Sequence, residues 1–167
     1  METTSIDSNK VLESLDREDR FALQCALASV SDLMTRQVVT LEVHRPLCDA
    51  ARLFSSGKFR QILILDGPCL AGVLSDRDVL HASLRDADPA NTTVSTAMTR
   101  NPVTIRPHAS ISEAIHLLTS KGVECLPVTG ENGIVYGIIT KSDLLQVSFV
   151  LQRWIETRAP RLHASCT

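Results

Sequence analysis

The strongest constraint on the fold of this chain is an internal repeat. Residues 30–36 (Val-Ser-Asp-Leu-Met-Thr-Arg) return 64 positions later as residues 94–100 (Val-Ser-Thr-Ala-Met-Thr-Arg). Residues 72–78 (Gly-Val-Leu-Ser-Asp-Arg-Asp) return 65 positions later as residues 137–143 (Gly-Ile-Ile-Thr-Lys-Ser-Asp). A repeat of this length predicts two copies of one supersecondary unit.

The two copies contain the same local patterns in the same order. Short β-branched and apolar runs alternate with stretches whose apolar residues recur at the i, i+3, i+4 spacing of a helix. The first copy has runs at 38–41, 62–65 and 70–74, with helices starting at Pro46 and Ser75; the second has runs at 103–105, 126–128 and 134–139, with helices starting at Ser110 and Thr140. Each copy is therefore predicted to be a β-α-β-β-α unit of the α+β class.

A single copy of about 60 residues is too small to bury both faces of its sheet. We therefore expect the copies to pack together about an approximate two-fold axis within the chain. The expected boundaries are a flank at 1–29, the copies at 30–85 and 94–150, and a C-terminal end at 151–167. Apolar spacing predicts a flanking helix over Asn9–Ala28. The last helix of the second copy is expected to continue until Pro160 stops it.

Composition excludes several classes of protein. The formal net charge of −2 lacks the basic excess typical of nucleic-acid binding. Five dispersed cysteines without a C-x-x-C pair argue against a disulfide framework or zinc site and favour a reducing cytoplasm. His44 and His108 match in the two copies but lack a second ligand at metal spacing. With no apolar stretch near ~18 residues and no apolar signal core, we expect a cytoplasmic protein without membrane insertion.

The most informative candidate sites are the starts of the second helix in each copy. Ser75 precedes Asp78 by three positions, and Thr140 precedes Asp143 by three. One interpretation is a capping box, in which hydroxyl and acid satisfy backbone N–H groups at the helix start. The other is a ligand site, since free N–H groups at a helix start attract phosphate and an aspartate can accept both ribose hydroxyls. The sequence is compatible with both interpretations.

These features resemble the CBS domain family, named after cystathionine β-synthase, in the paired arrangement called a Bateman module. The resemblance covers about 30–80 and 94–145. It rests on Met34-Thr35, Met98-Thr99, Val39-Thr40, Val103-Thr104, Leu126-Pro127-Val128 and the two Gly…Ser/Thr-x-x-Asp strings. It implies copies packed about a pseudo-two-fold axis, frequent dimerisation into a flat disc, and clefts that bind AMP, ADP, ATP, S-adenosylmethionine or NAD.

Carried over residue by residue, the resemblance implies ligand contacts in both copies. Asp78 and Asp143 would hold ribose hydroxyls, with Ser75 and Thr140 beside the ribose or phosphate. The adenine pocket would be lined by Val39, Thr40, Val103, Thr104 and Pro127.

The two copies differ at positions that bear on phosphate binding. The first copy has Arg60 and Arg77 where the second has Glu124 and Ser142, although Lys141 lies next to Ser142. The first copy also has Leu63 where the second has Pro127, which reshapes its base pocket. We therefore expect phosphate affinity to concentrate near the first copy. Arg60 is not assigned to the Asp78 site alone, because paired clefts of such modules lie close together and Arg60 can reach a phosphate at either helix start.

The functional expectation is a stand-alone sensor that binds an adenine nucleotide of the AMP, ADP or ATP class and signals to a partner protein. S-adenosylmethionine and NAD are the second choice of ligand. The apolar stripes predict a homodimer, and the repeats display no base or nucleophile for catalysis, so we expect neither enzyme activity nor a catalytic cofactor. The alternative is a CBS-fold module that dimerises but binds no nucleotide.

Overall fold

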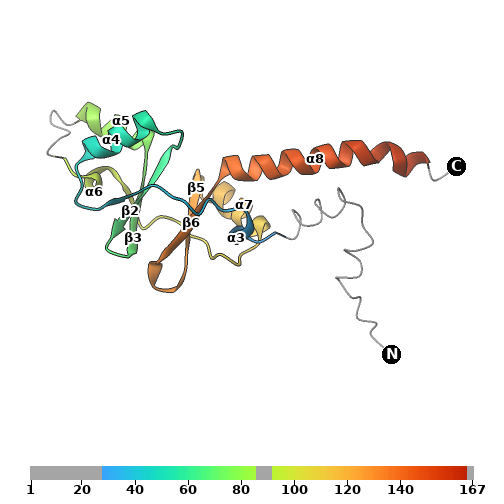
Figure 1. Ribbon diagram of the computed structural model, residues 1–167, viewed down its shortest axis with the longest axis horizontal. Helices are drawn as coiled ribbons and strands as arrows, with labels where there is room; N and C mark the ends of the chain where they lie inside the picture. The colour runs from blue at the N-terminus through green and yellow to red at the C-terminus, as the bar shows by residue number, and fades with distance from the viewer. Residues whose placement is uncertain (1–27, 86–91, 165–167) are drawn as a thin grey trace.

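The computed structural model describes residues 28–85 and 92–164, excluding the side chains of Trp154 and residues 157–164. Two small α+β units lie side by side, and one long helix projects from the second (Figure 1). The expected flanking helix over Asn9–Ala28 lies outside the described residues, apart from Ala28.

The order of elements follows the predicted repeat. After the short helix α3 (Val30–Leu33), the first copy contains β1 (Thr40–Glu42), α4 (Leu47–Ser56), β2 (Gln61–Asp66), β3 (Cys69–Ser75) and α5 (Asp76–Arg85). The second copy contains α6 (Val94–Ala97), β4 (Thr99–Arg100), α7 (Ile111–Ser120), β5 (Cys125–Thr129), the 3-10 turn η1 (Glu131–Gly133), β6 (Val135–Thr140) and α8 (Lys141–Ala164). The predicted α+β class is confirmed.

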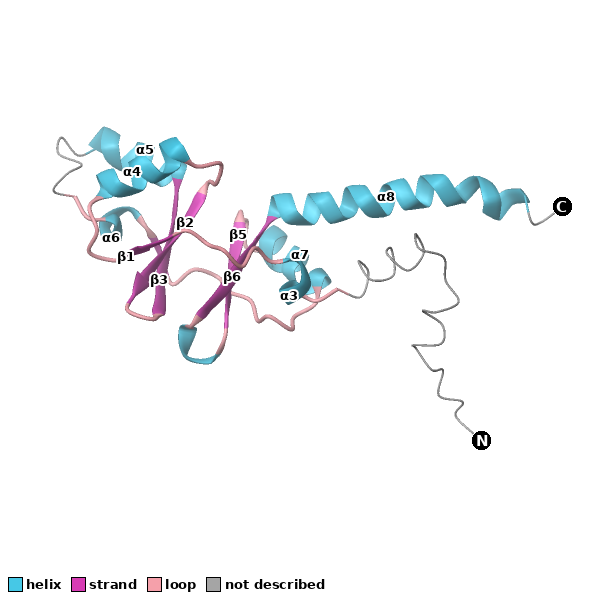
Figure 2. Ribbon diagram, viewed as in Figure 1, coloured by secondary structure: helices cyan, strands magenta, loops and turns pink. Residues whose placement is uncertain are grey.

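Two sheets stand side by side at the centre of the molecule, with α4 and α5 beside one and α7 beside the other (Figure 2). The first sheet has the order β1-β2-β3-β4, in which β1 and β2 are parallel and the other pairs antiparallel. The second sheet consists of antiparallel β5 and β6. The expected first strand of the second copy is reduced to one parallel bridge, between Ile105 and Val128.

The leading segment of each copy pairs with the sheet of the other copy. Thr35 N donates to Ile138 O at 2.9 Å, and Ile138 N donates to Thr35 O at 3.0 Å. At the matching positions Thr99 in β4 pairs with Val73 in β3. This reciprocal exchange, which was not predicted from the sequence, ties the two copies together through backbone hydrogen bonds.

The hydrophobic cores follow the same exchange. Val94 and Met98 pack in the core formed by α4, β2, β3 and α5 of the first copy. Val30 and Met34 pack in the core formed by α7, β5, β6 and α8 of the second. Each copy therefore needs the leading segment of the other to complete its core, which explains physically why the copies fold as a pair.

The two helices predicted to open at Pro46 and Ser110 begin there. Pro46 is the N-cap of α4, and Ser110 is the N-cap of α7, where its side chain accepts a hydrogen bond from Glu113 N at 3.1 Å. The expected stop of the last helix at Pro160 is wrong, because α8 continues to Ala164. A proline inside a helix removes one backbone hydrogen bond and kinks or breaks the helix, and here the helix goes on.

Candidate functional site

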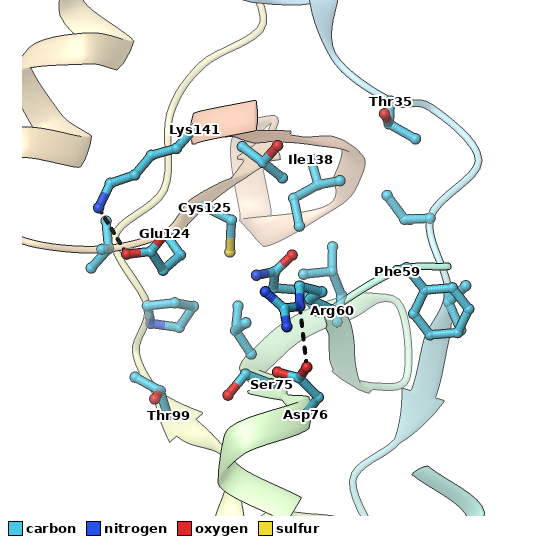
Figure 3. Close-up of a pocket in the computed structure, with 18 of the residues that line it drawn as sticks. Thr35, Phe59, Arg60, Ser75, Asp76, Thr99, Glu124, Cys125, Ile138 and Lys141 are labelled. Atoms are coloured by element: carbon cyan, nitrogen blue, oxygen red, sulfur yellow. Dashed lines mark hydrogen bonds and ion pairs between the residues drawn. The ribbon is translucent and has the colours of Figure 1, made fainter. Parts of the chain in front are cut away.

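A cleft of about 950 Å³ opens between the two copies and is lined by residues of both. Figure 3 shows side chains from both copies converging on this cleft. It contains the starts of α5 and α8, where the sequence predicted ligand contacts. We call the region around Ser75–Asp78, with Lys58 and Arg60, the α5 half-site, and the region around Thr140–Asp143, with Glu124, the α8 half-site.

The start of α5 is held by a reciprocal set of hydrogen bonds. Asp78 Oδ2 accepts from Ser75 N at 2.9 Å and from Ser75 Oγ at 2.6 Å. Asp78 N donates to Ser75 Oγ at 3.1 Å. The capping box is therefore formed, and Asp78 Oδ1 takes no part in it.

The start of α8 repeats this arrangement. Asp143 Oδ2 accepts from Thr140 N at 2.8 Å and from Thr140 Oγ1 at 2.7 Å, and Asp143 N donates to Thr140 Oγ1 at 3.3 Å. The capping interpretation is confirmed at both helix starts. Because each box uses only one carboxylate oxygen, capping leaves the second oxygen available for a ligand.

Nine of the twelve predicted site residues line the cleft: Val39, Arg60, Ser75, Arg77, Asp78, Val103, Thr140, Lys141 and Asp143. Thr40, Thr104 and Pro127 do not. Thr40 and Thr104 have exposed side chains, and Pro127 is fully buried within β5. Thr40 begins β1, and side chains alternate along an extended chain, so Val39 facing the cleft directs Thr40 away from it. Val103 and Thr104 precede the bridge at Ile105 and belong to no strand.

Charged side chains in the cleft form one ion pair in each half-site (Figure 3). Arg60 Nε lies 3.3 Å from Asp76 Oδ2 in the α5 half-site. Lys141 Nζ lies 2.8 Å from Glu124 Oε1 in the α8 half-site. Asp76 was not predicted as a cleft residue, although its position beside Ser75 at the start of the helix could have indicated it.

The Glu124 carboxylate is electrostatically stabilised from both half-sites. The hydrogen bond from Lys141, followed by the charge of that ammonium, holds the pKa of Glu124 below its ordinary value. The charge of Arg77, from the α5 half-site, lowers the same pKa to a smaller extent. The two half-sites are therefore close enough to influence each other electrostatically.

Cys125 lies at the centre of the molecule, where it packs with Leu63 and Ile138 from the two sheets. Burial raises the pKa of its thiol to about 11, and the charge of Glu124 adds to this effect. A thiol that ionises less readily in the folded protein destabilises the fold as pH rises, because the unfolded chain releases its proton first.

We therefore expect Cys125 to make the free energy of unfolding fall as pH rises from about 9 to about 11, by about 2 kcal/mol. Below about pH 8 the thiol is almost entirely neutral in both states and contributes little pH dependence. Denaturant unfolding of the parent and of Cys125→Ala at four values between pH 8 and 11 measures this. The variant should show the flatter profile, and two parallel profiles would contradict the expectation.

Comparison with known proteins identifies the family. The model of the CBS domain matches residues 30–85 and 94–149. The chain belongs to the CBS domain family and carries two copies of the domain, as the resemblance implied. Among its relatives, the CBS domain-containing protein YhcV of Bacillus subtilis is 30% identical over 118 residues, which cover 71% of this chain and 84% of YhcV.

Solved structures show the same fold. CBSX2, solved in complex with AMP, has a TM-score of 0.64 and 23% identity, and the match covers 74% of this chain and 98% of that chain. The CBS domain pair of MJ0100 was solved in complex with 5′-methylthioadenosine and S-adenosyl-L-methionine. It has a TM-score of 0.65 and 20% identity, and the match covers 72% of this chain and 99% of that chain. Within the residues that the structure describes, no helix is long and apolar enough to span a bilayer.

Proposed function

We propose that this chain is a regulatory module whose central cleft binds an adenosine-containing nucleotide of the AMP, ADP or ATP class, and whose bound state a partner protein recognises. The observation that carries the proposal is the convergence of both hydroxyl-x-x-Asp helix starts in one cleft of about 950 Å³. A volume of this order accommodates nucleotide-sized ligands.

The cleft offers each part of such a ligand a suitable contact. Asp78 Oδ1 or Asp143 Oδ1 would accept hydrogen bonds from the ribose hydroxyls, while Oδ2 keeps the helix capped. The apolar side chains of Val39 and Val103 would contact adenine. Arg60, Arg77 and Lys58 would stabilise phosphate oxygens, since a guanidinium fits phosphate with paired N–H donors.

The solved relatives support the choice of ligand class. CBSX2 was solved with AMP and the MJ0100 domain pair with two adenosine derivatives. Adenine and the ribose ring with its 2′,3′-diol are the parts that these ligands share, and we infer the same ligand class here by fold analogy. The free thiols Cys48, Cys69 and Cys125 fit a cytoplasmic protein.

A panel of ligands tests the proposal. Thermal unfolding of the protein is measured with AMP, ADP, ATP, NAD and S-adenosylmethionine, each at increasing concentration. A ligand present at 100 times its dissociation constant should stabilise the fold by about 2.7 kcal/mol. We expect stabilisation by at least one adenine nucleotide, with the ligand recovered chemically unchanged. Stabilisation by none of the five would contradict the proposal, and recovery of a converted product would indicate an enzyme.

The second candidate function is a dimerisation module without a nucleotide, and exposed apolar residues on two helices favour dimerisation in either case. Leu80 and Leu84 on α5 occupy the same repeat positions as Leu145 and Phe149 on α8, and all four are exposed. Leu84 is 78% exposed and Phe149 is 61% exposed. We propose that these helix faces pack against those of a second copy of the chain.

We expect the parent protein to give a light-scattering mass of twice 18.3 kDa at micromolar concentration. The double variant Leu84→Glu with Phe149→Glu should give 18.3 kDa, because each chain would have to bury two carboxylates in the interface. Ile134→Glu, at the exposed turn between β5 and β6, is the control and should remain dimeric. A monomeric parent would refute the proposed dimer without bearing on nucleotide binding.

A further inference from the structure

The two half-sites carry the same ion pair with its charges reversed. Asp76 N donates to Arg60 O at 3.2 Å, and Lys141 N donates to Glu124 O at 3.1 Å. These matching backbone bonds show that the four residues occupy equivalent places. In the α5 half-site the cation, Arg60, lies just before β2 and the anion, Asp76, lies on α5. In the α8 half-site the anion, Glu124, lies just before β5 and the cation, Lys141, lies on α8.

The remaining charges of the cleft strengthen this difference. Lys58 and Arg77 line the α5 half-site, whereas the matching positions in the second copy are Gly122 and Ser142, which carry no charge. Besides the ion pair, each half-site has one further aspartate, which is Asp78 in the α5 half-site and Asp143 in the α8 half-site. The α5 half-site therefore has one more basic than acidic side chain, and the α8 half-site has one more acidic than basic side chain.

We propose that the α5 half-site takes an adenosine whose 5′ group is a phosphate, and that the α8 half-site takes an adenosine whose 5′ group is uncharged or cationic, such as a thioether or a sulfonium. Glu124 is the residue that sets the preference of the α8 half-site. This inference rests on the proposed function and adds the ligand class of each half-site.

The physical argument is one of charge pairing. A phosphate entering the α5 half-site meets Lys58 and Arg77 in addition to Arg60, so it can pair with cations without leaving Asp76 unpaired. The basic side chain of the α8 half-site is Lys141, whose ammonium is already bonded to Glu124. The charge of Arg77 also reaches this half-site, but its effect on Glu124 is smaller than that of Lys141. The charge of a phosphate there would also oppose the Glu124 carboxylate, which a sulfonium would attract.

Two ligands that differ only at the 5′ group test the inference: AMP and 5′-methylthioadenosine. Each is titrated calorimetrically into the parent, Asp78→Asn and Asp143→Asn, since asparagine keeps the side-chain shape. We expect Asp78→Asn to weaken AMP at least tenfold and Asp143→Asn less than threefold. The order should reverse for 5′-methylthioadenosine. Equal losses of both ligands in both variants would overturn the inference.

Glu124→Gln tests the specificity residue directly. This variant removes one negative charge and frees Lys141. We therefore expect a second AMP to bind per chain, in the α8 half-site, with an affinity at least tenfold higher than that of the α8 half-site of the parent. Glu131→Gln, an exposed residue outside the cleft, makes the same change in net charge and should leave both ligands unaffected. AMP binding by Glu124→Gln that matches the parent would overturn the inference. If neither ligand binds the parent, the proposed function itself fails, which is a distinguishable result.

Discussion

Replacing Asp78 and Asp143 together by alanine is expected to weaken adenosine binding by roughly ten- to a hundredfold. Each carboxylate would lose a charge-assisted hydrogen bond to a ribose hydroxyl, which contributes about 1.5–3 kcal/mol. Adenosine is the appropriate probe because it has no phosphate, and the double variant reports on ribose contacts whichever half-site is occupied. Equilibrium dialysis or calorimetry measures the loss.

The chain provides a matched control for the structural part of this substitution. Ser29 and Asp32 form a third box of the same kind, in which Asp32 Oδ2 accepts from Ser29 N at 2.8 Å and from Ser29 Oγ at 2.6 Å. This box lies outside the cleft. Asp32→Ala should therefore lower stability by about 1 kcal/mol, as loss of a cap does, and leave adenosine binding unchanged. Equal binding losses in Asp32→Ala and the double variant would mean that the aspartates act only as caps.

Gly137→Ala is expected to destabilise the fold by about 3 kcal/mol, at the upper end of the cost of overpacking. A Cβ on Gly137 would lie 2.7 Å from the carbonyl oxygen of Thr35 and 2.9 Å from the sulfur of Met34. The methionine can move, but the oxygen accepts a hydrogen bond from Ile138 N. Relief of the clash would therefore break the backbone exchange between the copies.

The matching position in the other copy should behave alike. A Cβ on Gly72 would lie 2.6 Å from the sulfur of Met98 and 2.8 Å from the oxygen of Thr99. Gly122→Ala is the reference, because its φ is +65° but nothing lies within 4 Å of the added carbon. It should cost about 1 kcal/mol through backbone strain alone. Denaturant unfolding that ranks Gly137→Ala and Gly72→Ala at or below Gly122→Ala would contradict the account of the exchange.

Much of the fold follows from patterns that are local in the sequence. Apolar runs and helical spacing located β1, β2, β3, α4 and α5 of the first copy, and the hydroxyl-x-x-Asp strings located the starts of α5 and α8. The short helix α3 was not predicted. The exchange of leading segments could not be predicted. Apolar periodicity indicates that Val30 and Met34 are buried, but it does not indicate which of the two copies contains the core in which they are buried. Strand alternation, applied strictly, would have separated Val39 from Thr40 in the expected adenine pocket.

The charges of the cleft were predicted only in part. The contrast between Arg60 and Glu124 is visible in the sequence, but their pairing with Asp76 and Lys141 depends on how close the strand and the following helix come. The expected concentration of phosphate affinity near the first copy stays a prediction. The structure supports this prediction with one further residue. Lys58 lines the cleft and adds a cation to the α5 half-site, and it was not among the predicted site residues.

A calorimetric titration of the parent protein with AMP and with 2′-deoxy-AMP tests the central claim most directly. If the cleft binds adenosine through a carboxylate on the ribose diol, AMP should give a saturable heat. The deoxy compound should bind at least tenfold more weakly, because it lacks one charge-assisted hydrogen bond of about 1.5 kcal/mol. The absence of saturable binding by AMP up to millimolar concentration, or equal affinity for the two compounds, would contradict the account.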